Sequence, residues 1–112
     1  FTQRDTSENS YTAATSQNLD TGKWYHVSGT YNGSETKIYL NGTQKDYVNG
    51  PSTRSISSLD TFSLGYRADA DDRYFNGKID DVRIYNTALN PIQIERLFHK
   101  AAYRIPREDT LQ

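Results

Sequence analysis

The chain has 112 residues, enough for one domain with a modest core, and its formal net charge is −1. This near-neutral balance argues against bulk electrostatic binding to nucleic acid or to an anionic membrane. The absence of cysteine excludes a disulfide framework, a thiolate nucleophile and a thiolate metal site, and no apolar run is long enough to span a membrane.

The first half of the chain predicts short strands joined by turns. Residues 24–31 alternate between two faces that both carry aromatic side chains, which indicates a strand covered on both sides. Asn32-Gly33-Ser34 then turns the chain into a strand at residues 36–41. The dipeptide Asn41-Gly42 is a strong hairpin signal, and it returns the chain through residues 43–48.

After a polar loop, residues 62–66 are expected to form a strand with Phe62, Leu64 and Tyr66 on one side. An acidic loop follows at residues 67–74. Short strands separated by turn signals at this spacing indicate an antiparallel sandwich.

Residues 75–86 are the most informative stretch. Asn76-Gly77 supplies turn chemistry, and the residues that follow suit a strand. Val82 and Ile84 define one face of this strand and Asp80 shares their parity, so a carboxylate is expected on a side that otherwise looks buried. A buried carboxylate needs a cation or several hydrogen-bond donors, which makes the position either functional or a structural clamp.

One helix is expected near the C-terminus, from Pro91 to about Lys100. Asn90 suits the N-cap, Pro91 suits the first helical position, and Gln93 completes a capping box. The apolar stripe of this helix consists of Ile94, Leu97, Phe98 and Ala101.

Three blocks carry a family resemblance: Gly22–Gly33 with its Trp-Tyr-His-Val run, the Lys37–Gly42 hairpin, and Gly77–Leu89. In residue types, order and spacing they resemble the central strands and the closing strand of laminin G-like domains in the concanavalin A-like lectin/glucanase superfamily. The resemblance covers roughly residues 19–98 and is more specific for fold than for function.

The resemblance implies an all-β fold, an antiparallel jelly-roll β-sandwich with one short C-terminal helix packed against an edge. The sandwich is expected over residues 1–103, with a polar tail at 104–112. Laminin G-like domains usually carry several strands before the first of these blocks, so we expect that the first strands are missing here. Other domains or chains would then complete the sandwich, and an oligomer or assembly contact is expected.

The resemblance also implies a place for calcium. In related sandwich β-glucanases an aspartate at the start of the closing strand helps to hold a structural calcium ion. This role falls on Asp80, with the backbone oxygens of Gly77 or Lys78 as further ligands. The alternative is that Asp80 accepts hydrogen bonds as a clamp. Asp81, on the opposite face, is expected to pair with Arg83 or with a neighbouring strand.

Two loop features complete the candidate sites. The acidic loop at 67–74 offers Asp69 and Asp71 as a second place for calcium, although it lacks the EF-hand pattern and a solvated loop is the favoured alternative. Tyr66 and Tyr74 flank this loop and are the best candidates for exposed rings that stack on a sugar, because most other tyrosines are expected to pack within or between sheets.

Catalysis is not expected. The glucanases of the superfamily use two carboxylates on one strand in a Glu-x-Asp-x-x-Glu type motif, which this chain lacks. The two histidines give neither a triad nor a metal pair. His26 is expected to be packed and hydrogen-bonded, and His99 to end the helix, where its charge favours the helix terminus.

These features predict a non-catalytic recognition or adhesion module of a secreted or cell-surface protein. A glycan or a surface protein is the expected partner, and calcium the expected structural cofactor. Two alternatives stay open. The chain could be a structural assembly module of a surface layer, filament or virion, or the C-terminal part of a glycoside hydrolase whose catalytic strand lies upstream.

Overall fold

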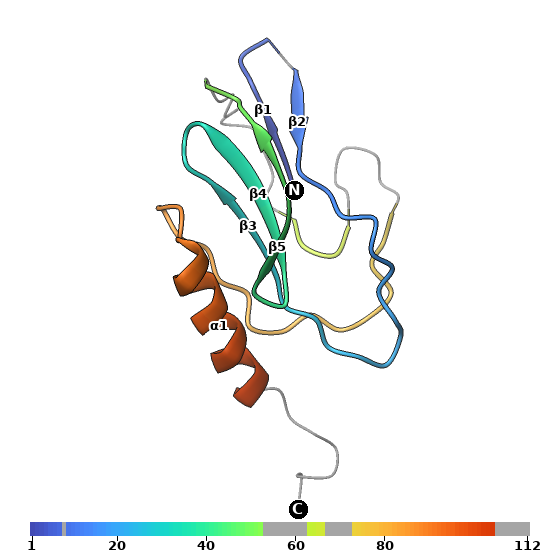
Figure 1. Cartoon of the computed structure of the whole chain (residues 1–112). Helices are drawn as coiled ribbons and strands as arrows, with labels where there is room; N and C mark the ends of the chain where they lie inside the picture. Colours follow the sequence, from blue (N-terminus) through green and yellow to red (C-terminus); the bar gives the residue numbers. More distant parts are fainter. Residues whose placement is uncertain (8, 53–62, 67–72, 105–112) are drawn as a thin grey trace, which may run out of the picture.

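The computed structural model describes residues 1–7, 9–52, 63–66 and 73–104. These residues form two antiparallel sheets and one helix, so the fold is mostly β, as predicted, and is consistent with a β-sandwich (Figure 1). A two-stranded sheet pairs β1 with β2, and a three-stranded sheet has the order β3-β4-β5. The elements are β1 (Thr2–Arg4), β2 (Ser10–Thr12), β3 (Val27–Tyr31), β4 (Glu35–Leu40), β5 (Thr43–Asn49) and α1 (Pro91–Arg104).

The hairpin of β4 and β5 confirms the prediction from Asn41-Gly42. Leu40 pairs with Thr43, and the two turn residues have positive φ angles of 50° and 78°, as a two-residue hairpin turn requires. Tyr39 and Leu40 point to opposite faces of the sheet, yet they are only 1% and 5% exposed. Both faces of the sheet are therefore covered at this end of the hairpin.

The turn between β3 and β4 also forms as predicted. The Asn32 side-chain oxygen accepts hydrogen bonds from the backbone N–H groups of Ser34 at 2.9 Å and Glu35 at 2.8 Å. The strand before it is shorter than predicted, because β3 begins at Val27 instead of residue 24, and Trp24 is 42% exposed. The expectation that both faces of residues 24–31 are covered is therefore wrong at the start of this segment.

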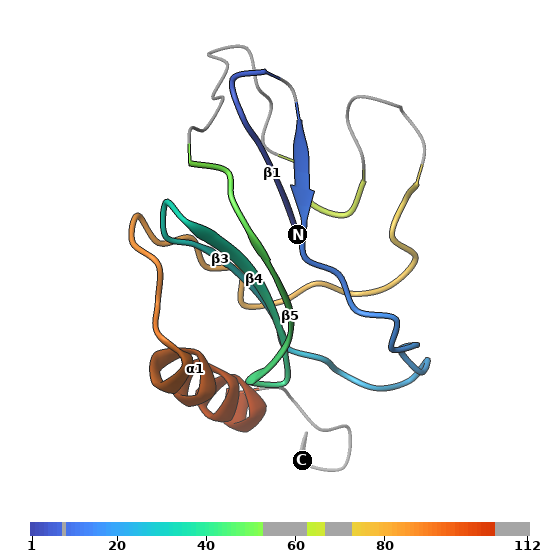
Figure 2. The same cartoon turned by 45° about the horizontal axis from the view of Figure 1, so that its top comes forward.

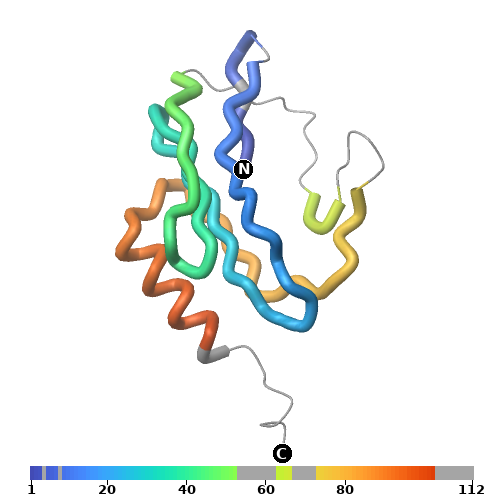
Figure 3. The backbone as a smooth tube through the Cα atoms, turned by 45° about the vertical axis from the view of Figure 1, so that its right-hand side comes forward, coloured from blue at the N-terminus to red at the C-terminus, as the bar shows by residue number. Residues whose placement is uncertain are grey.

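The three-stranded sheet lies between the β1–β2 sheet and the helix (Figures 2 and 3). The ring of Phe1 sits against Gly29 of β3, where an added Cβ would lie 2.5 Å from the ring. On the other flank, the backbone N–H of Ala14 donates to the Asp46 carboxylate of β5 at 2.8 Å. On the helix side, Gly42 lies close to Phe98. Because the turn glycine has no side chain, the helix can pack directly against the end of the hairpin.

The helix begins where its capping box predicts. The Asn90 side-chain oxygen accepts from the Gln93 backbone N–H at 2.9 Å, and the Gln93 side chain accepts from the Asn90 backbone N–H at 2.9 Å. Ile94 is 2% exposed and Ala101 8%, in line with the predicted stripe. The helix runs to Arg104, so the prediction that His99 ends it is wrong. His99 instead faces Glu95 across one turn at 3.6 Å.

Two predicted strands do not form. Residues 63–66 make a bend, while Phe62 lies outside the described residues. Residues 77–86 are irregular, and Asp81 has a φ of 53°, which breaks an extended strand. Val82 is 50% exposed and Ile84 72%, and Asp80 is exposed as well, which corrects the expectation of a buried carboxylate. A strand needs a partner edge, and no described strand pairs with this segment.

Candidate functional site

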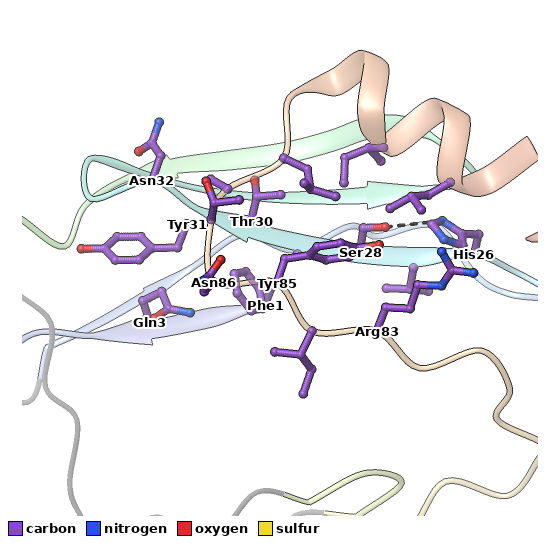
Figure 4. A pocket seen from close by; sticks show the side chains of 18 of the residues that line it. Phe1, Gln3, His26, Ser28, Thr30, Tyr31, Asn32, Arg83, Tyr85 and Asn86 are labelled. Atoms are coloured by element: carbon purple, nitrogen blue, oxygen red, sulfur yellow. Dashed lines mark hydrogen bonds between the residues drawn. The ribbon is translucent and has the colours of Figure 1, made fainter. Parts of the chain in front are cut away.

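A cleft of about 990 Å³ lies between β3 and residues 81–89 (Figure 4). Phe1 and Gln3 of the N-terminal segment close one side of the cleft, and Ile94 and Leu97 of the helix close the other. The cleft follows the edge of β3 that is not paired with β4. Its floor is therefore a strand edge, and its opposite wall is the segment that was expected to be the closing strand.

A small polar cluster sits at one end of the cleft. The Ser28 hydroxyl and His26 Nδ1 are 3.4 Å apart, and the ring of Phe98 lies 6.0 Å from the imidazole. Burial lowers the pKa of His26 below its ordinary value of 6.5, while the nearby Asp81 carboxylate acts in the opposite direction and Arg83 in the same direction. The imidazole is thus half-buried and favoured in its neutral form, close to the packed histidine that was predicted.

Asp81 is held by a charged partner. Arg83 Nε lies 2.9 Å from Asp81 Oδ1, which is one of the two pairings predicted for this aspartate. Among the described residues that line the cleft, Asp81 is the one with an acidic side chain. Most glycoside hydrolases use two carboxylates about 5 to 9.5 Å apart, whereas the described lining of the cleft contains the single carboxylate of Asp81.

The predicted aromatic pair comes together on the surface. The rings of Tyr66 and Tyr74 stack with centroids 6.0 Å apart and planes inclined by 16°. They are 42% and 68% exposed. The backbone N–H of Phe75 donates to the Gly65 carbonyl at 2.6 Å, which joins the two segments next to the tyrosines. The result is an exposed double ring with a fixed backbone beneath it.

The candidate calcium residues are not gathered in the described structure. Asp80 Oδ1 accepts a hydrogen bond from the backbone N–H of Asp81 at 2.8 Å, and Gly77 is exposed. No group of three or more acidic, histidine or cysteine side chains lies together among residues 1–7, 9–52, 63–66 and 73–104. Calcium takes about six to eight oxygen ligands, so these residues alone do not complete a site. Asp69 and Asp71 lie outside the described residues.

Comparison with known families identifies the family of this chain. The sequence profile of the family described as "Concanavalin A-like lectin/glucanases superfamily" (Laminin_G_3) matches residues 1–95. The chain belongs to this superfamily. The family resemblance of the Trp-Tyr-His-Val block and of the closing segment is thereby confirmed. A search among curated proteins gives no match.

One solved structure resembles this superfamily member in both fold and sequence. It is the 2.1 Å crystal structure of an S-layer domain-containing protein (residues 221–444) from Clostridium thermocellum ATCC 27405. The two chains are 26% identical, with a TM-score of 0.54, and the match covers 75% of this chain and 43% of that one. The chain therefore spans less than half of the structure that it matches. Within the described residues, the helix is too short and too polar to cross a bilayer.

Sequence reasoning missed the cleft, because its walls come from segments that are distant in the sequence. His26 and Ser28 belong to the β3 region, whereas Arg83 belongs to the segment across the cleft. A signal was nonetheless present. Ser28 and Gly29 are small residues in the middle of a predicted strand, and a Gly inside a strand often marks a place where another backbone or a ligand approaches closely.

Proposed function

We propose that this chain is a non-catalytic recognition module of a surface or secreted protein and that it binds carbohydrate through Tyr66 and Tyr74. The observation that carries the proposal is the exposed stack of these two rings. Membership of a lectin-containing superfamily supports a sugar ligand, and the S-layer domain-containing neighbour supports a place at the cell surface. The jelly-roll order of a complete sandwich is part of the same proposal.

The rings suit a ligand of this class. An apolar sugar face packs on an aromatic face, and a tyrosine combines such a face with a polar hydroxyl at the rim of the ring. Hydrophobic contacts from Leu64 and Phe75, which are 50% and 59% exposed, would extend the surface around the pair. The described cleft offers one carboxylate, which favours binding over hydrolysis.

The test is binding of the chain to an array of oligosaccharides, followed by calorimetry on each hit. Tyr66→Ala and Tyr74→Ala are each expected to weaken binding about tenfold or more, since a central aromatic contact commonly dominates such an interface. Tyr47→Ala is the matched control, because Tyr47 is 53% exposed on β5 and lies outside the pair. Unchanged affinity in both pair variants, or no binding to any glycan, would refute the proposal.

A second candidate function is a structural module of a surface layer without a small ligand. The observation in its favour is the name of the matched structure, an S-layer domain-containing protein. This candidate predicts self-assembly of the parent protein that does not depend on Tyr66 or Tyr74. Electron microscopy of the assembled parent, with and without the Tyr74→Ala substitution, separates the two candidates.

A further inference from the structure

An edge of β3 that no described strand pairs lies on one side of the cleft, and a segment with the residue pattern of a strand contributes to its other side. β3 pairs with β4 on one side, and no described strand pairs with its other edge. Residues 79–85 read Ile-Asp-Asp-Val-Arg-Ile-Tyr, which suits a strand, yet they form none. Asp81, Arg83, Ile84 and Tyr85 of this segment line the cleft of about 990 Å³ together with the residues of β3 (Figure 4). Open strand edges of this kind are the usual place where another strand is added.

The segment is complementary to itself. When two copies of residues 79–85 run antiparallel with Val82 opposite Val82, Asp81 of each copy lies opposite Arg83 of the other. Opposite charges in cross-strand positions stabilise a pair of strands, and like charges destabilise it. The same register places Ile79 opposite Tyr85, a pair of a β-branched and an aromatic residue, and it leaves Asp80 opposite Ile84.

We propose that the occupant of the cleft is a second copy of this chain, which inserts its residues 79–85 beside β3 while receiving the same segment in return. Each inserted segment then pairs with β3 of its host on one side and with residues 79–85 of its host on the other. A two-fold axis passes between the two segments, so the interface is isologous and closed. One continuous sheet of eight strands results, from β5 of one copy to β5 of the other.

Burial favours this arrangement, and the charges are compatible with it. Val27, Val82 and Ile84 are 58%, 50% and 72% exposed, and the inserted strand would cover apolar surface at all three. The two ion pairs between Arg83 and Asp81, one inside each chain at 2.9 Å, are exchanged for two pairs between the chains. Asp81 must leave its φ of 53° for an extended conformation, and the burial of apolar surface has to offset the cost of this change because the number of ion pairs stays the same. The proposal does not depend on the carbohydrate site.

Charge reversal at residues 81 and 83 tests the proposed register of the two segments through the oligomeric state, without a measurement of folding stability. Asp81→Arg alone and Arg83→Asp alone each place like charges in both cross-strand positions, and each is expected to weaken dimerisation about tenfold in sedimentation velocity. An equimolar mixture of the two variants restores opposite charges between copies and is expected to form the heterodimer. Neither variant can form the ion pair between positions 81 and 83 within its own chain. Dimerisation of the mixture must therefore come from ion pairs between the two chains.

Two outcomes would overturn the proposal: a wild-type chain that stays monomeric up to about millimolar concentration, or a mixture that dimerises no better than either variant alone. Circular dichroism of each variant checks that it is folded. If a charge variant unfolds, a cysteine cross-link in the otherwise unchanged chain still tests the proposed dimer. The natural chain has no cysteine, so a single introduced thiol can form a disulfide only with another copy.

Val82→Cys is expected to give a disulfide-linked dimer under mild oxidation, since the proposed register brings the two Val82 positions within disulfide distance. Ile92→Cys is the matched control, because Ile92 is 61% exposed on the helix and away from the segment. Equal cross-linking of the two variants would contradict the proposed register. Cross-linking specific to Val82→Cys supports it.

Discussion

The contact between the hairpin turn and the helix allows a sharp test with two glycines. Gly42 and Gly22 have nearly the same φ angle, 78° and 77°. A methyl group on Gly42 would lie 3.2 Å from Phe98 Cδ2 and 3.3 Å from Glu95 Cα, whereas a methyl group on Gly22 meets nothing within 4 Å. Alanine at either position has the same backbone strain, and alanine at Gly42 also has to push the helix away.

The left-handed backbone costs an L-residue about 1 to 2 kcal/mol, so Gly22→Ala is expected to lower the free energy of unfolding by about that amount. Overpacking at a well-packed contact adds about 1 to 3 kcal/mol, so Gly42→Ala is expected to cost about 2 to 5 kcal/mol. Urea denaturation followed by circular dichroism measures both values. Phe98→Ala combined with Gly42→Ala should recover part of the crowding term, because the nearest atom belongs to the Phe98 ring.

Equal losses for the two glycine variants would refute the reasoning, since they would show that the helix does not rest on the hairpin turn. A loss at Gly42 that Phe98→Ala leaves unchanged would assign the crowding to the Glu95 backbone instead. The contact matters for the cleft as well, because Ile94 and Leu97 on the same helix close one of its sides.

Three further predictions concern the helix start, the histidine and calcium. Asn90→Ala removes the N-cap acceptor and should lower the free energy of unfolding by about 1 kcal/mol in the same urea assay, and an unchanged value would count against the capping box. The pKa of His26 is lowered in the folded chain, so the stability that the neutral imidazole contributes is present above its ordinary value of 6.5 and is lost as the pH falls below it. Stability should therefore fall between about pH 7.5 and pH 5, and less so in His26→Gln than in the control His99→Gln. The calcium proposal for Asp80 predicts a melting temperature that rises by several degrees between EDTA and saturating calcium, and a rise that survives in Asp80→Ala would contradict it.

The parts of the fold that the sequence predicted well are those fixed by residues close together in the chain. Asn41-Gly42 determines a two-residue turn through its own backbone preferences, and Asn90 with Gln93 closes a capping box within four residues. The pairing of Asp81 with Arg83 is equally local. Each of these features requires only the interaction of near neighbours, so its residue pattern is sufficient evidence for it.

The candidate site was predictable only in part. Tyr66 and Tyr74 could be selected as exposed rings beside a loop, but their stacking depends on the backbone hydrogen bond between Phe75 and Gly65. The cleft lies between β3 and residues 81–89, which are at least fifty positions apart in the chain. Such long-range geometry has no signature in a local pattern of residues.

The closing segment shows why a strand pattern is a conditional prediction. Val82, Ile84 and Tyr85 have the side chains of a strand, but a strand is stabilised by hydrogen bonds to a neighbouring strand and by burial of one face. In the described chain the segment has neither, and Ile84 is 72% exposed. The segment therefore has the residue pattern of a strand, and its partner is not among the described strands. That is the reason why an open edge on β3 and an unpaired segment opposite it point to a second copy, and why the charge-reversal mixture is the experiment that distinguishes a missing partner from a mistaken prediction.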